Sequence, residues 1–266
     1  AANLCNLSFT TRIPNNKGDI TLMLDANAAN DRVQTDVSWS FDRKKAYRGL
    51  VSLTASFPRC EESARRDVAV NVNHSRFEVN DTVWNVSPGR IMYQDKSVLV
   101  DSVRVGRPGQ FVLVNGSATA SPDDKILVDL RDIDLDYVFE TLNINYVTFG
   151  GRASGRVEVS SLFSGSPVLA TEQLSVKRLT YNNSLLGNAL IDSHWDNGRK
   201  SVYLDARISE NKNQVARIYG DIFATRDSLS LHCDARKVNI GFMQPFMAAF
   251  SSAIEGRASG KVHLYG

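Results

Sequence analysis

Residues 151–157 read Gly-Arg-Ala-Ser-Gly-Arg-Val, and residues 256–262 read Gly-Arg-Ala-Ser-Gly-Lys-Val. The offset from 151 to 256 is 105 residues, and five identical residues in a row are an unusual coincidence in one chain. Flanking apolar positions agree at the same offset: Ile133 with Val238, Leu135 with Ile240, Tyr137 with Phe242, and Leu142 with Met247. A long fixed period is typical of repeat architectures, in which each unit buries its face against the next.

The repeat divides the chain into three segments. We expect a first, partial unit at residues 1–131, a second unit at residues 132–236 that starts with a crossover, and the start of a third at residues 237–266. The first residues carry neither the apolar core of a signal peptide nor a spanning helix. We therefore expect a piece of a longer protein, whose targeting signal and inner-membrane anchor lie outside it.

Strict alternation of apolar and polar residues dominates the chain and predicts half-buried β-strands. The clearest runs are residues 51–57, 126–130 and 202–208. Turn signals separate such runs, among them Ser-Pro-Gly at 87–89 and Arg-Pro-Gly at 107–109. Their short, regular spacing predicts an all-β fold built as an antiparallel meander.

Two stretches break the alternation. Phe242, Phe246 and Phe250 fall at i, i+4 and i+8, which predicts a short crossover helix with one apolar stripe. Residues 137–142 are a shorter and weaker version of the same pattern. We expect the three phenylalanines to face the apolar interior as a plug.

Composition and motifs argue against several function classes. Lys plus Arg number 31 against 29 Asp plus Glu, a balance that gives no basic field for nucleic acid. The acidic triplet at 132, 134 and 136 lacks the glycine and glutamate of a calcium loop. The four histidines form no metal-binding spacing, and the three cysteines form no CxxC pair. We expect no catalytic residue, no metal and no cofactor, and therefore not an enzyme.

The order of several short motifs resembles one protein family. Those motifs are Phe-Glu-Val-Asn-Asp-Thr-Val-Trp-Asn-Val-Ser-Pro at 77–88, Val-Leu-Val-Asn-Gly at 112–116, Ser-Pro-Asp-Asp at 121–124, Gly-x-x-x-Gly at 151–155, Leu-Ser-Val-Lys-Arg-Leu-Thr-Tyr-Asn-Asn at 174–183, Leu-Gly at 186–187 and Trp-Asp at 195–196. This order, over about residues 20–266, resembles TamB-type translocation and assembly module proteins of the AsmA-like group, in particular Bacteroidetes versions.

The resemblance implies an inner-membrane-anchored protein that crosses the periplasm as an elongated curved sheet or groove with an apolar inner surface. Repeating β-groove units of several strands plus a crossover fit the 105-residue period, with crossovers at 132–150 and 237–255. The family is implicated in moving phospholipid to the outer membrane and in outer-membrane protein assembly through a barrel partner. It has no catalytic residues to carry over.

A groove of this kind needs apolar side chains and no charged ligand, because an exposed acyl chain costs about 0.8 kcal/mol per CH₂. The candidate groove-lining residues are Val51, Leu53, Phe57, Ile126, Val128, Leu130, Val202, Leu204 and Ile208. Alternation places their neighbours, such as Asp129 and Asp205, on the opposite face.

Two alternatives stay open at this point. The same alternation describes a closed β-sandwich, in which the apolar face is ordinary core. Such a sandwich could serve as an extracellular adhesion or glycan-binding module. That function needs exposed aromatic rings, and Trp39, Trp84 and Trp195 are the candidates.

Overall fold

The structure is a computed structural model that describes residues 5–14, 19–41, 47–57, 67–79, 81–121, 123–136, 149–163, 168–196, 198–223, 228–241 and 255–266. The predicted all-β class and antiparallel meander are confirmed in these residues. By its contacts the chain forms two compact units, residues 1–128 with 160–164, and residues 129–159 with 165–266. Each unit is described by itself below.

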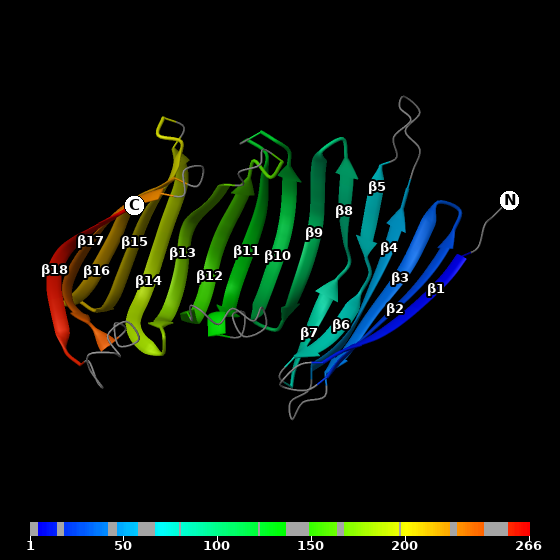
Figure 1. The fold of residues 1–266 in the computed structure, drawn as a ribbon, viewed down its shortest axis with the longest axis horizontal. Coiled ribbons are helices and arrows are strands. Elements are labelled where there is room, and N and C mark those ends of the chain that lie inside the picture. Colours follow the sequence, from blue (N-terminus) through cyan, green and yellow to red (C-terminus); the bar gives the residue numbers. More distant parts are fainter. Residues whose placement is uncertain are drawn as a thin grey trace. The chain divides into compact units, whose positions relative to one another are not determined.

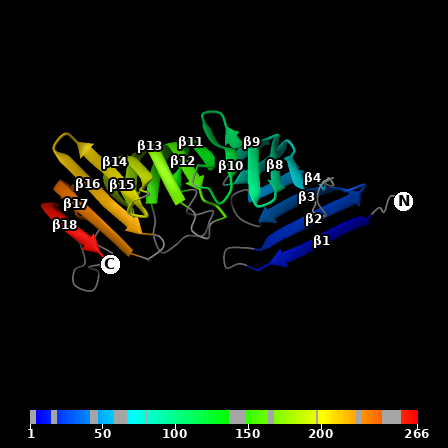
Figure 2. The same ribbon diagram turned by 90° about the horizontal axis from the view of Figure 1, so that it is seen from above.

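The described part of the first unit includes the strands β1 to β10, which follow one another from blue to green in Figure 1. They are β1 (Cys5–Ile13), β2 (Ile20–Ala29), β3 (Arg32–Phe41), β4 (Tyr47–Ser56), β5 (Val68–Val72), β6 (Ser75–Val79), β7 (Thr82–Ser87), β8 (Gly89–Gln94), β9 (Ser97–Arg107) and β10 (Gln110–Ala118). Figure 2 shows β1 to β4 as a single layer, and each pairs antiparallel with the next.

At two places in this unit the chain bends between consecutive strands without reversing its direction. β5 and β6 both pair with β4, and β7 and β8 both pair with β9. The predicted turn at 87–89 is therefore a bend, because Pro88 has no N–H for the ladder while the chain keeps its direction along β9. The turn predicted at 107–109 does form a hairpin, since Arg107 pairs with Gln110.

Polar side chains fill the gap that the first bend leaves in the ladder. The Ser52 amide donates a hydrogen bond of 2.9 Å to the hydroxyl of Ser75, and the Asn73 amide donates to the Ser52 carbonyl at 2.9 Å. Ser75 is itself buried. A buried serine replaces the missing strand partner, so the backbone polar groups at the bend stay satisfied.

The second unit is a regular meander. Its strands are β12 (Phe149–Ser160), β13 (Val168–Tyr181), β14 (Ser184–Asp196), β15 (Ser201–Asn211), β16 (Gln214–Phe223), β17 (Ser228–Asn239) and β18 (Arg257–Tyr265), while β11 (Lys125–Asp134) enters it from residue 129. From β13 to β18 each strand pairs antiparallel with the next. β14 also contacts β17 across the two strands between them, so the sheet of this unit curls.

The repeated motif adopts the same local geometry twice within this unit. The Asp132 amide donates to the Ser154 hydroxyl at 2.8 Å, and the Lys237 amide donates to the Ser259 hydroxyl at 2.8 Å. Asp132 and Lys237 have φ values of 51° and 50°, and Gly151 and Gly256 have 119° and 131°. A serine thus holds a left-handed bulge at both positions, which explains why Gly and Ser recur at the 105-residue offset.

The predicted crossovers fall mainly outside the described residues. Leu135 and Asp136 have helical backbone, but residues 137–148 and 242–254 are not described. Phe242, Phe246 and Phe250 belong to the second of these ranges, so their role as a plug stays a prediction. The boundaries of the three predicted repeat units likewise stay predictions.

Candidate functional site

In the second unit, four described rows across β14 to β18 share one face and contain no charged residue. Partner positions of antiparallel strands share a face, so the pairings fix its composition. Across β14 to β18 its rows are Trp195, Val202, Ile222 and Leu229; Ser193, Leu204, Gly220, Leu231 and Leu264; Ile191, Ala206, Ile218, Cys233 and Val262; and Ala189, Ile208, Ala216, Ala235 and Gly260. We call these four rows the apolar face.

The apolar face is the inner side of the curled sheet. Ala153 of β12, Val176 and Leu179 of β13 and Ala189 of β14 form one buried cluster. Ile208 of β15 packs against it, although β15 lies beyond β14. Small residues at the centre allow strands that are not neighbours to share contacts, which draws this face together.

No second layer of described strands covers this face, because each described strand of the unit packs mainly against its sequence neighbours. Large side chains at its far end stay open to solvent. Ile222 of β16 and Leu229 of β17 are 36 % and 38 % exposed, although each strand has a paired neighbour on both sides. A closed sandwich would cover these positions, whereas the described part of the sheet leaves them open.

The opposite face carries the charges of the same strands. Its rows are His194, Tyr203, Asp221, Ser230 and Tyr265; Asp192, Asp205, Tyr219, His232 and His263; and Leu190, Arg207, Arg217, Asp234 and Lys261. We call these three rows the polar face. Arg217 binds Asp205 through two nitrogens at 2.9 and 2.8 Å, and Arg207 adds a contact of 3.3 Å. The hydrogen bonds from Arg217 lower the pKa of Asp205, and Arg207 contributes in the same direction.

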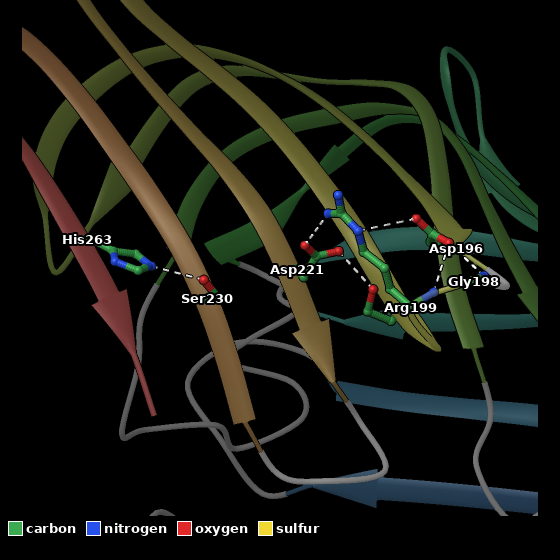
Figure 3. Close-up of polar contacts among 7 residues, drawn as sticks. Asp196, Gly198, Arg199, Asp221, Ser230 and His263 are labelled. Carbon is green, nitrogen blue, oxygen red and sulfur yellow. Dashed lines mark hydrogen bonds and ion pairs between the residues drawn. The ribbon is translucent and has the colours of Figure 1, made fainter.

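Figure 3 shows a second charged group, at the hairpin between β14 and β15. Arg199 binds Asp221 at 2.7 Å, and the hydroxyl of Ser201 donates to the other oxygen of Asp221 at 2.8 Å. Asp196 accepts from the amides of Arg199 and Gly198 at 3.1 and 2.8 Å, and these bonds lower its pKa. Ser201 is 0 % exposed and bound directly to a carboxylate, so it fixes the hairpin rather than presenting a nucleophile.

A line of stacked rings crosses the polar face. The ring centroids of Tyr219 and His232 are 5.3 Å apart, and those of His232 and His263 are 4.2 Å apart with planes 7° from parallel. His263 also shares a hydrogen bond of 2.9 Å with Ser230 (Figure 3). Stacking occupies the ring faces and leaves ring edges outward, an arrangement that stabilises the pairing of β16, β17 and β18.

The predicted groove-lining residues fall into three places. Val202, Leu204 and Ile208 belong to the apolar face of the second unit. Val51 and Leu53 lie together on a corresponding face of the first unit, opposite Val37 and Thr35, and Phe57 directly follows β4. Ile126, Val128 and Leu130 alternate along β11, with Ile126 buried. That all nine line one trough stays a prediction.

Several members of the apolar face were not among the sequence candidates. Ile218 and Leu231 are central to it, and Cys233 lies in the same row as Ile218. β16 and β17 show the same alternation of apolar and polar residues as β15, so the sequence pattern that predicts a half-buried strand is present in them too. Only the pairing register says which alternating runs share a face.

The tryptophans lie with the apolar side chains. Trp39 and Trp84 are on the apolar side of the first unit's strands, and Trp195 belongs to the apolar face of the second. Trp84 is only 8 % exposed, and the other two are half-buried. Trp84 is therefore not an exposed ring, and the glycan-binding alternative, with Trp39 and Trp195 as its remaining candidates, stays a prediction.

Comparison with known proteins gives no match. No family model, curated protein or solved structure is significantly similar to this chain. Within the described ranges, no cluster of three or more His, Cys, Asp or Glu could hold a metal ion. A search of the same ranges for a helix long and apolar enough to span a membrane found none.

Proposed function

We propose that this chain is a periplasmic segment of a membrane-bridging protein whose apolar sheet face shields lipid acyl chains between membranes. The observation that carries the proposal is the apolar face: four rows without a charged residue, partly solvent-exposed and uncovered by described strands. Ordinary soluble domains rarely expose contiguous apolar patches, so such a surface calls for an occupant.

An acyl chain suits this surface. It needs no directional contact, and burying ten methylenes is favourable by about 8 kcal/mol. Charged residues are excluded from the apolar face and concentrated on the polar face, so a lipid tail on the first would meet no desolvated charge.

The wider role rests on the family resemblance. In the proposal the cargo is phospholipid or another acyl-chain lipid destined for the outer membrane. Outer-membrane protein assembly through a barrel partner is a second task of the same segment. The inner-membrane anchor and the contacts with that partner lie in other parts of the full-length protein.

The thiol of Cys233 offers a direct test, because it lies in a row of the apolar face between Ile218 and Val262. With Cys5 and Cys60 replaced by serine, an environment-sensitive fluorophore on Cys233 reports on that face. Adding phospholipid should shift its emission to the blue and increase its intensity.

The matched control carries Cys233→Ser together with Asp234→Cys. Position 234 pairs with Lys261 on the polar face, one residue along the same strand. Its fluorophore should respond little to lipid. An equal response at both positions would mean that lipid does not distinguish the faces, and the proposal would be wrong.

A further inference from the structure

A hollow lies on the polar side of the first unit, far in sequence from the apolar face described above. It has a volume of about 280 Å³ and is lined by Asn85, Ser87, Arg104 and Gly106, with the turn at 107–109 at one end. Gly106 pairs with Asn85 of β7. The space above Gly106 is occupied by Phe111, whose Cβ would lie 2.7 Å from a Cβ added at Gly106.

Arg104 lines this hollow, and the pairings place Arg76 one strand beyond Asn85. Arg76 pairs with Asn85, and Asn85 pairs with Gly106, so these three positions form one row across β6, β7 and β9. Ser87 pairs with Arg104 in the next row on the same face. With strands about 4.8 Å apart, the Cα atoms of Arg76 and Arg104 lie about 12 Å apart on a diagonal. An anion over Asn85 and Ser87 is within reach of both side chains.

Each of the two neighbouring carboxylates, Glu78 and Asp101, has a basic residue at its register position on the next strand. Arg48 binds Glu78 at 3.0 Å. Asp101 accepts a hydrogen bond of 2.9 Å from the Ser102 hydroxyl, and Arg90 is its register partner on β8. Among the described residues, neither Arg76 nor Arg104 forms an ion pair, so each adds a positive charge to this patch that no described carboxylate neutralises. The Arg104 guanidinium lies 4.5 Å from the centre of the Phe111 ring, a stacking contact that holds it in place without using its N–H donors.

We propose that this hollow binds a phosphate group. A tetrahedral dianion needs several donors from different directions. The lining provides the Arg104 guanidinium, the Asn85 amide and the Ser87 hydroxyl, and Arg76 lies beside Asn85 on the next strand. No carboxylate among the described residues lines the hollow. The site lies on the face opposite the apolar residues of its own unit, so it does not depend on the proposed lipid-shielding role. Its ligand is either a soluble phosphate monoester or the headgroup of a phosphomonoester lipid.

Calorimetric titration of the chain with inorganic phosphate and with glycerol 3-phosphate tests the soluble form. Flotation with phosphatidylcholine vesicles, with and without phosphatidic acid, tests the lipid form. Saturable binding in either arm is expected, and the responding arm identifies the source. Arg76→Gln and Arg104→Gln should each weaken binding about tenfold, because each removes a charge-assisted contact.

Arg32→Gln is the matched control, because it removes the same charge from a strand end on the same side of the same unit, opposite Ser56. It should leave the affinity within about twofold, as expected for an exposed charge outside the site. The proposal is overturned if neither arm shows saturable binding. It is equally overturned if Arg32→Gln weakens binding as much as the other two, which would indicate a diffuse charge effect.

Discussion

The two faces of β15 to β18 belong to the same strands yet differ completely in chemistry. Leu204 and Ile218 belong to the apolar face, while their chain neighbours Asp205 and Tyr219 belong to the polar face. In the four described rows of the inner side, the Cys233 thiol is the one ionisable group, whereas the outer side has the bidentate Arg217–Asp205 ion pair and stacked rings. A single-layer sheet can therefore expose a polar face to water while its other face remains available to an apolar ligand.

A charged residue introduced on the inner side should lower the stability of the fold most strongly. Ala206 is buried in the middle of the apolar face. Ala206→Asp should lower the free energy of unfolding by about 3 kcal/mol or more, because it buries an unpaired carboxylate. Ser209→Asp, on the exposed outer side of the same strand, should change it by less than about 0.5 kcal/mol. Denaturant unfolding of both variants checks the contrast, and equal effects would mean that the inner side is solvated.

A methyl group at Gly220 should disturb the inner side through the backbone. Gly220 has φ of 143°, and a Cβ there would overlap the Ser230 carbonyl oxygen on β17. Gly220→Ala should therefore cost about 2 kcal/mol, by strain and by loss of strand pairing. Gly260→Ala is the control, because no atom lies within 4 Å of its Cβ position. A stable Gly220→Ala variant would contradict the pairing of β16 with β17.

The serine that recurs in both copies of the motif allows the stability contributions of the two copies to be compared. Ser154→Ala and Ser259→Ala each remove the hydroxyl that accepts from a bulge amide. Each should cost about 1 kcal/mol, the usual net value of one such hydrogen bond. Thermal unfolding of the single variants measures this. A loss at Ser154 without any loss at Ser259 would show that the two copies are not structurally equivalent.

The smallest change in stability is expected for a substitution on the outer side of the sheet. Because the pKa of Asp205 is lowered in the folded chain, its ion pairs stabilise the fold at neutral pH. This contribution should be lost as the pH falls through the folded pKa, below the ordinary range of an aspartate. Asp205→Asn should cost about 0.5 kcal/mol at pH 7, since both arginines are largely exposed and screened.

Acid titration of stability checks the sign. The difference between the native chain and Asp205→Asn should shrink toward low pH. A difference that grows on acidification would contradict the ion pairs with Arg207 and Arg217.

The sequence predicts the strands well, because alternation is a local signal. Residues 51–56, 126–130 and 202–208 fall within β4, β11 and β15, respectively. It does not predict that Pro88 bends a strand, since the same Ser-Pro-Gly signal also marks a reversal and only the long partner β9 decides between them. To predict the full apolar face, one must know the pairing register of the strands. To predict the hollow lined by Gly106, one must know that β7 pairs with β9. Both depend on residues far apart in the sequence.

Photocrosslinking at two adjacent residues of β15 tests the central claim most directly. A benzophenone amino acid replaces Leu204 on the apolar face in one version of the full-length protein, and Tyr203 on the polar face in the other. Both are half-buried, and the Tyr203 replacement is conservative in shape. Irradiation in cells, followed by lipid extraction and mass spectrometry, should capture phospholipid at position 204 and little at position 203. Equal capture at both positions, or capture at neither, would contradict an apolar face that shields acyl chains.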